Sequence, residues 1–359
     1  MAQDKNLEIY LFIENRSLPH RPGWLINNVK GCTIRLIDNI IVKEKSQDTR
    51  TGYTIHGFRV IPYKLPILIL KYKPDILLLC NSTQLLVSYP IKFFSNCKIG
   101  LLVEDTLHSV SGKPRTYSTL KSAIYRKADF FFPFSNDASE YLRSINVKKP
   151  IYRISWSIDL NHFLNADQTK AERIKHELKI TDKLVFLTVS RIETAKGILN
   201  FLKAMKDLPP TVAKQIAYLI VGTGPQQPEI KSFLNIHNSL HVLLIGYKPY
   251  SEVVNYYYAA DVFVLPTLKD LFSLTSMEAM ACSLPILTTV YNGARELIEN
   301  GINGYIFDSA NIEDIRKTKI KIYRQQGKLK QMGDASLIKI KNYSHEKIMG
   351  ELKAILNTL

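Results

Sequence analysis

Short apolar segments alternate with longer, more polar ones along the whole chain. In the first half, segments rich in leucine and β-branched residues occupy 6–14, 32–42, 75–80 and 98–103. In the second half, similar segments occupy 183–190, 216–222, 241–246, 261–267 and 285–289. Near-continuous apolar strands separated by helical stretches are typical of parallel sheets covered on both faces. The pattern therefore predicts an α/β protein.

The length of the chain and one polar segment predict two domains. The chain has 359 residues, which is more than one ordinary core accommodates. The polar, charged stretch 164–182 precedes the first strong strand of the second half. We expect a first domain over 1–164 and a second over 165–335, each built as an α/β layer system.

Positive charge is the main feature of the composition. The net charge is +16, and residues 1–164 carry 23 Lys and Arg against 13 Asp and Glu. Such a chain favours anionic partners, and the alternative is a solvated basic surface without a specific partner. The basic run at 316–330 is interpreted as a solvated helix face rather than a binding patch. We find no continuous basic face with stacking aromatics, so we expect no nucleic-acid partner.

Several other classes of protein do not fit the sequence. The longest apolar run, 65–80, is interrupted by lysines and Asp75, which argues against a membrane-spanning helix. The first residues lack a basic region followed by an apolar one, so we expect no signal peptide. The four cysteines form no C-x-x-C pair, which indicates neither a zinc site nor a disulfide framework. We expect a protein of the reducing cytoplasm.

Candidate chemistry follows the strands of the second half. Ligands of doubly wound sheets bind beyond the carboxyl ends of the strands. The residues found there are two cations, two glycines and two acids, namely Arg191, Lys196, Gly222, Gly224, Asp270 and Glu278. We therefore expect a ligand site at this edge.

This set suits a phosphorylated ligand with a hydroxyl-rich part. Arg191 and Lys196 would neutralise a diphosphate, and a helix expected to begin near Leu271 would direct N–H groups at the same phosphates. Asp270 and Glu278 would hold two separate polyols. Taken singly, the two cations could be surface residues and Glu278 a capping or salt-bridge residue.

These segments resemble a known enzyme family. Residues 190–205, 218–230 and 244–307 resemble the C-terminal half of the retaining glycosyltransferases of the glycogen synthase-like group, glycosyltransferase family 4. Residues 157–163 resemble the signature that closes the first domain of that family. The resemblance implies a GT-B fold, with two Rossmann-like domains whose parallel sheets face each other across a cleft. The segment 336–359 would carry a last helix returning to the first domain.

The resemblance also implies roles for the candidate residues. Arg191 and Lys196 would contact the diphosphate of a nucleotide-sugar donor, Glu278 the ribose, and Asp270 the transferred sugar. The remaining donor-binding positions would be Gly222, Gly224 and the backbone N–H groups around Phe272, Ser273, Leu274 and Thr275. The family usually has two glutamates separated by seven residues; here the spacing holds and aspartate replaces the first. Leu271 and Ser273 stand where the family usually has glycines.

A second group of candidates follows the strand at 98–103. Glu104, Asp105 and His108 cluster there, and one of them would act as general base toward the acceptor hydroxyl. The alternatives are that either acid caps a turn and that His108 is structural. The resemblance implies front-face displacement, in which the leaving phosphate helps to deprotonate the acceptor. No D-x-D pair is placed to hold a metal, so we expect no metal and no cofactor.

Two basic, partly apolar stretches of the first half bear on the acceptor. Residues 82–98 would be a core helix or a surface that docks at an anionic membrane beside a lipid-linked acceptor, and 112–127 reads as a basic helix. The leading hypothesis is a retaining transferase that extends a cell-envelope polysaccharide or lipopolysaccharide, cytoplasmic or peripheral at the inner membrane face. The alternatives are a nucleotide-sugar epimerase, a soluble glycan synthase, or a non-enzymatic nucleotide-binding module.

Overall fold

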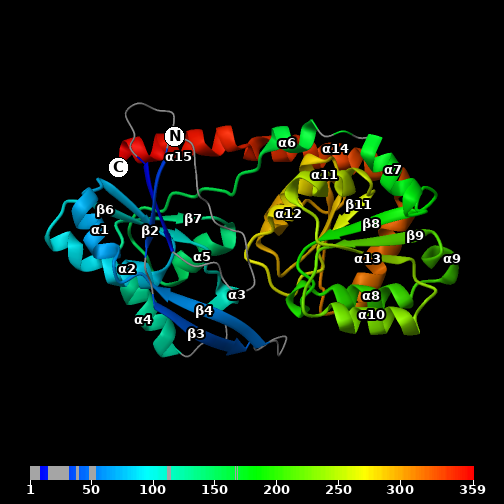
Figure 1. The fold of residues 1–359 in the computed structure, drawn as a ribbon, viewed down its shortest axis with the longest axis horizontal. Helices are drawn as coiled ribbons and strands as arrows, with labels where there is room; N and C mark the ends of the chain where they lie inside the picture. Colours follow the sequence, from blue (N-terminus) through cyan, green and yellow to red (C-terminus); the bar gives the residue numbers. More distant parts are fainter. Residues whose placement is uncertain are drawn as a thin grey trace. The chain divides into compact units, whose positions relative to one another are not determined.

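The computed structural model describes residues 9–14, 32–37, 40–47, 54–110, 115–165, 167 and 169–359 (Figure 1). The chain divides into two compact units. Unit 1 consists of Met1–Ile154 and Met349–Leu359, and unit 2 consists of Ser155–Ile348. The boundary thus lies at Ile154, not near residue 164, because the segment from Ser155 to α6 packs with unit 2.

Unit 1 contains a parallel sheet, β5-β6-β7, a parallel pair, β1-β2, and an antiparallel pair, β3-β4. Its core gathers around β5, β6 and β7, where Leu101, Val103 and Phe131 have no solvent exposure. Its elements in chain order are β1 (Ile9–Glu14), β2 (Cys32–Ile37), β3 (Ile40–Gln47), β4 (Thr54–Ile61), α1 (Leu65–Tyr72), β5 (Ile76–Leu79), α2 (Ser82–Ser88), η1 (Tyr89–Phe93), β6 (Lys98–Val103), α3 (Leu107–Val110), α4 (Arg115–Tyr125), β7 (Phe130–Pro133) and α5 (Asn136–Ser144).

Unit 2 is built on a six-stranded parallel sheet of order β10-β9-β8-β11-β12-β13. Its elements are α6 (Leu160–Leu164), α7 (Thr169–Glu177), β8 (Leu184–Val189), η2 (Thr194–Lys196), α8 (Ile198–Lys206), α9 (Pro210–Ala213), β9 (Ile216–Val221), α10 (Gln227–Ile236), β10 (Val242–Gly246), α11 (Tyr250–Tyr258), β11 (Val262–Val264), α12 (Leu274–Ala281), β12 (Ile286–Thr289), η3 (Gly293–Leu297), β13 (Gly304–Phe307), α13 (Ile312–Arg324), η4 (Gln326–Lys328), α14 (Leu329–Ile340) and η5 (Lys341–Tyr343). The last helix, α15 (His345–Thr358), begins in unit 2 and ends in unit 1.

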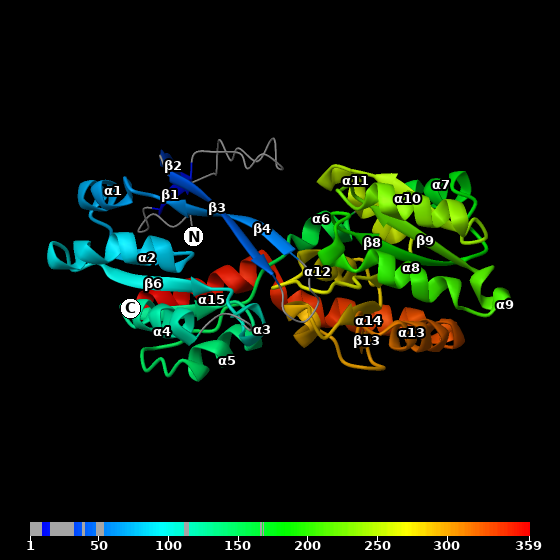
Figure 2. The same cartoon turned by 90° about the horizontal axis from the view of Figure 1, so that it is seen from below.

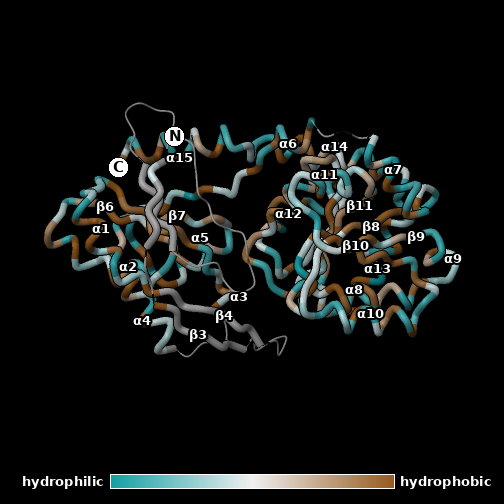
Figure 3. Tube along the Cα trace, viewed as in Figure 1, coloured by the Kyte–Doolittle hydropathy of each residue, from teal (hydrophilic) through white to brown (hydrophobic). Residues whose placement is uncertain are grey.

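Helices cover both faces of the unit 2 sheet. Helices α8, α10 and α13 pack on one face, and α6, α11 and α12 pack on the other (Figure 1). All six residues of β9 are buried, which a strand reaches only between two helical layers. Figure 3 shows the same arrangement as apolar residues concentrated along the central strands. No helix among the described residues has the length and apolar character needed to span a bilayer.

The strand prediction holds for β8 to β12 of unit 2, misses β13, and needs further corrections in unit 1. Residues 32–42, expected as one strand, contribute to both β2 and β3. The antiparallel pair β3-β4 departs from the expected parallel pattern. The short strands β7 and β13 were not predicted, because four apolar residues give too little pattern to separate a strand from a helix.

One glycine illustrates how closely the loops of unit 2 approach each other. Gly197 has φ +64°, and a Cβ atom there would lie 1.9 Å from the carbonyl oxygen of Pro266. We expect Gly197→Ala to lower the free energy of unfolding by at least about 1–2 kcal/mol, because the side chain is strained and also meets fixed backbone. Urea denaturation measures this.

Gly350 provides the matched control. It lies inside α15, where an added Cβ meets nothing within 4 Å. Gly350→Ala is expected to raise stability by roughly 0.5–1 kcal/mol through helix propensity. If the two substitutions had effects of the same sign, the close approach at Gly197 would be unimportant.

Candidate functional site

The candidate site lies where the strand order of unit 2 reverses. β8 is the first strand of the sheet in sequence, and its neighbours are β9 on one side and β11 on the other. Crossover connections leave opposite faces of the sheet at such a point, which opens a crevice beyond the carboxyl ends of the strands. The segments that follow β8 and β11 flank this crevice, and they carry Arg191, Lys196 and Asp270.

Short hydrogen bonds join these two segments. The carbonyl of Ala195 accepts from the backbone N–H of Leu268 at 2.7 Å and from the Thr267 hydroxyl at 2.8 Å. The carbonyl of Thr267 in turn accepts from the hydroxyls of Thr289 and Ser309, both at 2.8 Å. Backbone and small hydroxyls thus fix the loops, and the longer side chains remain for the ligand.

The site contains an ion pair that sequence reasoning did not foresee. The Lys196 ammonium donates to the Asp270 carboxylate at 2.6 Å, and the two side chains are only 19% and 15% exposed. The Asp270 backbone is fixed by Tyr291 and Gly293, which accept from and donate to it at 3.1 Å. Two groups expected to bind different parts of a donor therefore neutralise each other in the free protein.

Arg191 is more exposed to solvent than Lys196, the other cation beyond the carboxyl end of β8. Its side chain is 52% exposed, and its guanidinium donates to the carboxylate of Glu193. Part of its charge is thus already balanced.

The helix that follows Asp270 begins later than expected. α12 begins at Leu274 rather than near Leu271, because Ser273 is extended and its hydroxyl accepts from the Ser276 N–H at 3.1 Å. Phe272, Ser273, Leu274 and Thr275 thus form the entry and the first turn of the helix. First-turn N–H groups have no partner within a helix, and they carry its positive dipole end.

Glu278 lies on α12 in surroundings different from those of Asp270. The Tyr257 hydroxyl donates to it at 2.6 Å, and the same hydroxyl lies 3.4 Å from the Thr275 carbonyl. Burial raises the pKa of Glu278 above its usual value, against the opposing effects of the Tyr257 hydrogen bond and of His162. The carboxylate is thus positioned by a phenol instead of a cation.

Sequence reasoning missed the aromatic residues beside Glu278. Tyr257 is fully buried, and Tyr250 stacks on His162 with ring centroids 4.4 Å apart. Burial, followed by the charge of Glu278, raises the pKa of Tyr250 to about 12, so this phenol stays protonated. The available signal was the tyrosine run at 256–258, since buried phenols need hydrogen-bond partners.

The glycines expected near the donor lie at the adjacent strand ends. Gly222 has φ +134°, and its N–H donates to the Gly246 carbonyl at 2.8 Å. An added Cβ at Gly224 would lie 2.3 Å from the Ile192 carbonyl oxygen. Both glycines therefore permit close packing of the loops after β8, β9 and β10.

In unit 1, the three candidates after β6 differ in their surroundings. Asp105 accepts from Lys121 at 2.6 Å and also from the Tyr125 hydroxyl, so its carboxylate anchors α4. Glu104 is exposed, and its pKa is raised by partial desolvation and then by Asp105. His108 lies in α3, and its side chain is outside what the structure describes. Asp105 is thus held by α4, whereas Glu104 lies at the surface.

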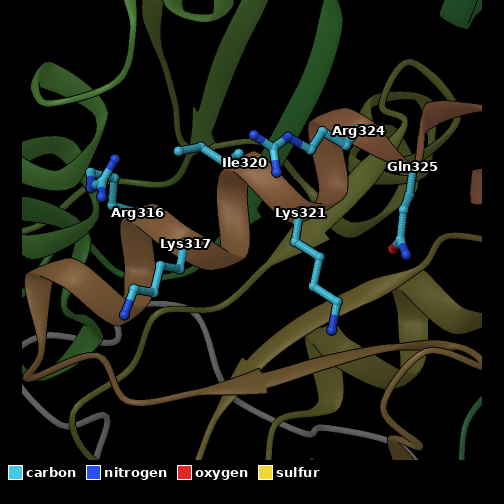
Figure 4. A pocket seen from close by; sticks show the side chains of 6 residues that line it. All are labelled: Arg316, Lys317, Ile320, Lys321, Arg324 and Gln325. Carbon is cyan, nitrogen blue, oxygen red and sulfur yellow. The ribbon is translucent and has the colours of Figure 1, made fainter.

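The structure bears on two basic segments, the one at 112–127 that was expected to be a basic helix and the one at 316–330 that was expected to be a solvated helix face. Lys121 was expected on a basic docking helix, but it is only 8% exposed and is paired with Asp105. The basic run of α13 lines a shallow hollow of about 440 Å³ (Figure 4). Arg316 pairs there with Glu313, and Lys317 is exposed, which agrees with a solvated helix face.

The described residues contain no group of three or more His, Cys, Asp or Glu side chains placed to hold a metal ion. The cationic side chains of the candidate site are Lys196 and Arg191, and the start of α12 lies at the same edge.

A double-mutant cycle measures the coupling between Lys196 and Asp270. We expect a coupling free energy of roughly 1.5–3 kcal/mol from urea denaturation of Lys196→Met, Asp270→Asn and the double variant, because the pair is largely shielded from water. The exposed pair Lys248 and Glu252, 3.8 Å apart, is the control and should give below about 0.5 kcal/mol. Equal coupling in both pairs would mean that the Lys196–Asp270 contact is not preorganised.

The chain resembles known glycosyltransferases in sequence. Residues 169–337 match the family model described as glycosyl transferases group 1. An uncharacterised glycosyltransferase of Methanocaldococcus jannaschii is 23% identical over 389 residues, which covers 100% of this chain and 92% of that protein. The capsular polysaccharide biosynthesis glycosyltransferase CapM of Staphylococcus aureus is 28% identical over 197 residues, or 54% of this chain and 50% of CapM.

Solved structures show the same architecture. Anabaena HepE in complex with UDP has a TM-score of 0.75 at 16% identity, covering 92% of this chain and 87% of that one. Sucrose-phosphate synthase from Thermosynechococcus elongatus has a TM-score of 0.74 at 18% identity, covering 98% and 89%. The predicted GT-B fold is confirmed by these likenesses. Residues 169–337 are thus similar to the group 1 glycosyltransferases, and the chain shares the GT-B fold of the solved structures.

Proposed function

We propose that the protein is a retaining, metal-independent glycosyltransferase. It moves a sugar from a nucleotide-diphosphate sugar to a lipid-linked glycan acceptor in the synthesis of a cell-envelope polysaccharide. The observation that carries this proposal is the convergence of Lys196, Asp270, Glu278 and the start of α12 at the switch point of the unit 2 sheet.

The donor class follows from the chemistry of these groups. A diphosphate needs cations and N–H donors, which Lys196, Arg191 and the first turn of α12 supply. Ribose and sugar hydroxyls need acceptors, which Glu278 and Asp270 supply. Anabaena HepE, which shares this fold, has structures in complex with UDP and with UDP-glucose, which supports a nucleotide-sugar donor.

Donor binding exchanges one ion pair for another in this proposal. The diphosphate takes Lys196 from Asp270, and the released carboxylate accepts hydrogen bonds from the transferred sugar. Glu278, already held by Tyr257, accepts from the ribose without rearrangement. Charge on the departing diphosphate is then stabilised by preorganised groups, which lowers the barrier to its departure.

The acceptor step belongs to unit 1. Glu104 is the proposed general base, and the leaving phosphate is the second candidate for the proton of the acceptor hydroxyl. Retention by front-face displacement needs no protein nucleophile. Relatives named for capsular polysaccharide, colanic acid and amylovoran biosynthesis support a polysaccharide product. One named alpha-monoglucosyldiacylglycerol synthase, from Acholeplasma laidlawii, supports a lipid acceptor.

The function is tested with a panel of nucleotide sugars in excess EDTA. The expected result is hydrolysis or transfer of one donor, with the configuration of the anomeric carbon retained by NMR. Activity that EDTA abolishes and Mg²⁺ or Mn²⁺ restores would contradict metal independence. Interconversion of nucleotide sugars without release of nucleoside diphosphate would instead indicate an epimerase.

Substitution of Asp270 and substitution of Glu278 should have different effects on the affinity for nucleoside diphosphate alone. Glu278→Gln should weaken binding by roughly 1.5–3 kcal/mol, because a charged hydrogen bond to ribose is weakened. Asp270→Asn should leave affinity unchanged or raise it, because Lys196 loses its competing partner, while turnover falls. Lys196→Met should weaken binding by a similar 1.5–3 kcal/mol. Calorimetry measures these affinities. Equal losses of affinity in Glu278→Gln and Asp270→Asn would refute the assignment of ribose to Glu278 and of the transferred sugar to Asp270.

Glu278 also predicts a pH dependence. Burial raises the pKa of Glu278 above its usual value, so its charge is lost at a higher pH than in a free peptide. Nucleoside diphosphate binding should therefore weaken as pH falls through this raised pKa. Glu278→Gln is the control, since it retains the titration of the ligand phosphates, and the difference between the two curves isolates Glu278. Parallel curves would show that Glu278 does not contact the ligand.

A further inference from the structure

Two adjacent phenylalanines at the end of η1 are largely exposed to solvent. Phe93 is 79% exposed and Phe94 is 78% exposed. Both belong to the segment that connects α2 to β6. This connection lies at the left-hand end of unit 1 in Figure 2. Scattered exposed apolar residues are normal, but paired aromatics on a short turn are an interaction signal.

The segment that carries them is anchored without them. Leu85 has no exposure and Ile91 is 5% exposed, and both belong to the unit 1 core. Leu86, on the outer side of α2, is 52% exposed. Residues 82–98 were expected to be either a core helix or a docking surface, and the structure gives the segment a buried side and an exposed apolar side.

Cations lie beside the aromatic pair. The Tyr89 ring meets Phe93 edge to face at 6.4 Å, and the Lys127 ammonium lies 4.0 Å from the centre of the Tyr89 ring. Arg126 is exposed next to Lys127. Lys92 is not available, because it is paired with Asp129. Lys127 is thus the cation that contacts the aromatic cluster, Arg126 is its exposed neighbour in the chain, and Lys121 is paired with Asp105 instead.

We propose that Phe93, Phe94 and Leu86, together with Arg126 and Lys127, form a docking surface for an anionic lipid bilayer. The inference deepens the proposed function and rests on it, since it names the surface that would bring the enzyme to a lipid-linked acceptor. Apolar side chains such as Phe and Leu insert into the boundary between headgroups and acyl chains, and nearby cations meet anionic headgroups.

Charge favours the bilayer over a second copy of the chain. Residues 1–164 carry 23 Lys and Arg against 13 Asp and Glu, so self-association through this surface would bring like charges together. A bilayer also needs no shape complementarity, which suits two side chains that project from a single turn.

The test uses the full-length protein and vesicles of phosphatidylcholine with or without phosphatidylglycerol. We expect binding to the anionic vesicles, weakened by salt. The variant Phe93→Ser/Phe94→Ser should lower the partition coefficient at least about tenfold, because each buried aromatic contributes a large apolar area. Ile236→Ser/Ile338→Ser is the matched control, since these residues are 76% and 69% exposed in unit 2, and it should bind as the parent does.

Charge is tested separately. Arg126→Glu/Lys127→Glu should weaken binding at least about tenfold at low salt, since each surface cation contributes about 1 kcal/mol. Lys317→Glu/Arg324→Glu on α13 removes the same charge elsewhere and should have a much smaller effect. Insertion itself is read from Phe94→Trp, whose fluorescence should be quenched by brominated lipids, whereas that of Ile236→Trp should not.

The vesicle-binding and sedimentation results distinguish a bilayer-docking surface from a self-association surface. Unchanged vesicle binding by the Phe93→Ser/Phe94→Ser variant, or equal loss in both charge-reversal variants, would overturn the docking surface. A dimer in sedimentation that the Phe93→Ser/Phe94→Ser variant dissolves would assign the surface to self-association instead. Nucleoside diphosphate titrations separate the two proposals, because this variant should retain donor affinity. If the parent bound vesicles but no nucleoside diphosphate, the proposed function alone would fail.

Discussion

Burial of the unit 2 sheet on both faces is the constraint on which the rest of this unit depends. Six parallel strands lie between two helical layers, and β9 is buried along its whole length. Such a sheet has no free face for a ligand, so polar chemistry is confined to the loops at its edges. The order of strands then selects one place among those loops, between β8 and β11, and that is where Lys196 and Asp270 meet.

Within this site, the environment gives two carboxylates different properties. Asp270 is neutralised by an ammonium group, so it can exchange partners when a competing anion arrives. Glu278 is held by the Tyr257 phenol and is partly buried, so it has no cation to lose. A neutral donor leaves the negative charge of the ionised carboxylate uncompensated, although burial raises its pKa and carries a cost in stability.

The sequence was informative where local pattern decides structure. Strands β8 to β12 of unit 2 and the residues at their carboxyl ends were predicted because continuous apolar runs and breaking residues are local signals. The start of α12 was misplaced by three residues, because the capping role of Ser273 depends on one side-chain hydrogen bond. The contacts Lys196–Asp270 and Asp105–Lys121 could not be predicted, since they join residues distant in sequence. Burial of Lys121 reverses what its position in a basic stretch suggests.

The hydrogen bonds around Thr267 separate the scaffold of the site from its recognition surface. The loop backbone is tied through carbonyl groups and small hydroxyls, whereas Lys196, Asp270 and Arg191 take no part in those ties through their side chains. Recognition positions can therefore vary while the scaffold stays constant. An aspartate at 270, and non-glycine residues at 271 and 273, are then tolerable departures within one fold. Under the proposed function, divergence of donor preference among related chains would require few substitutions and no insertion or deletion in the loops.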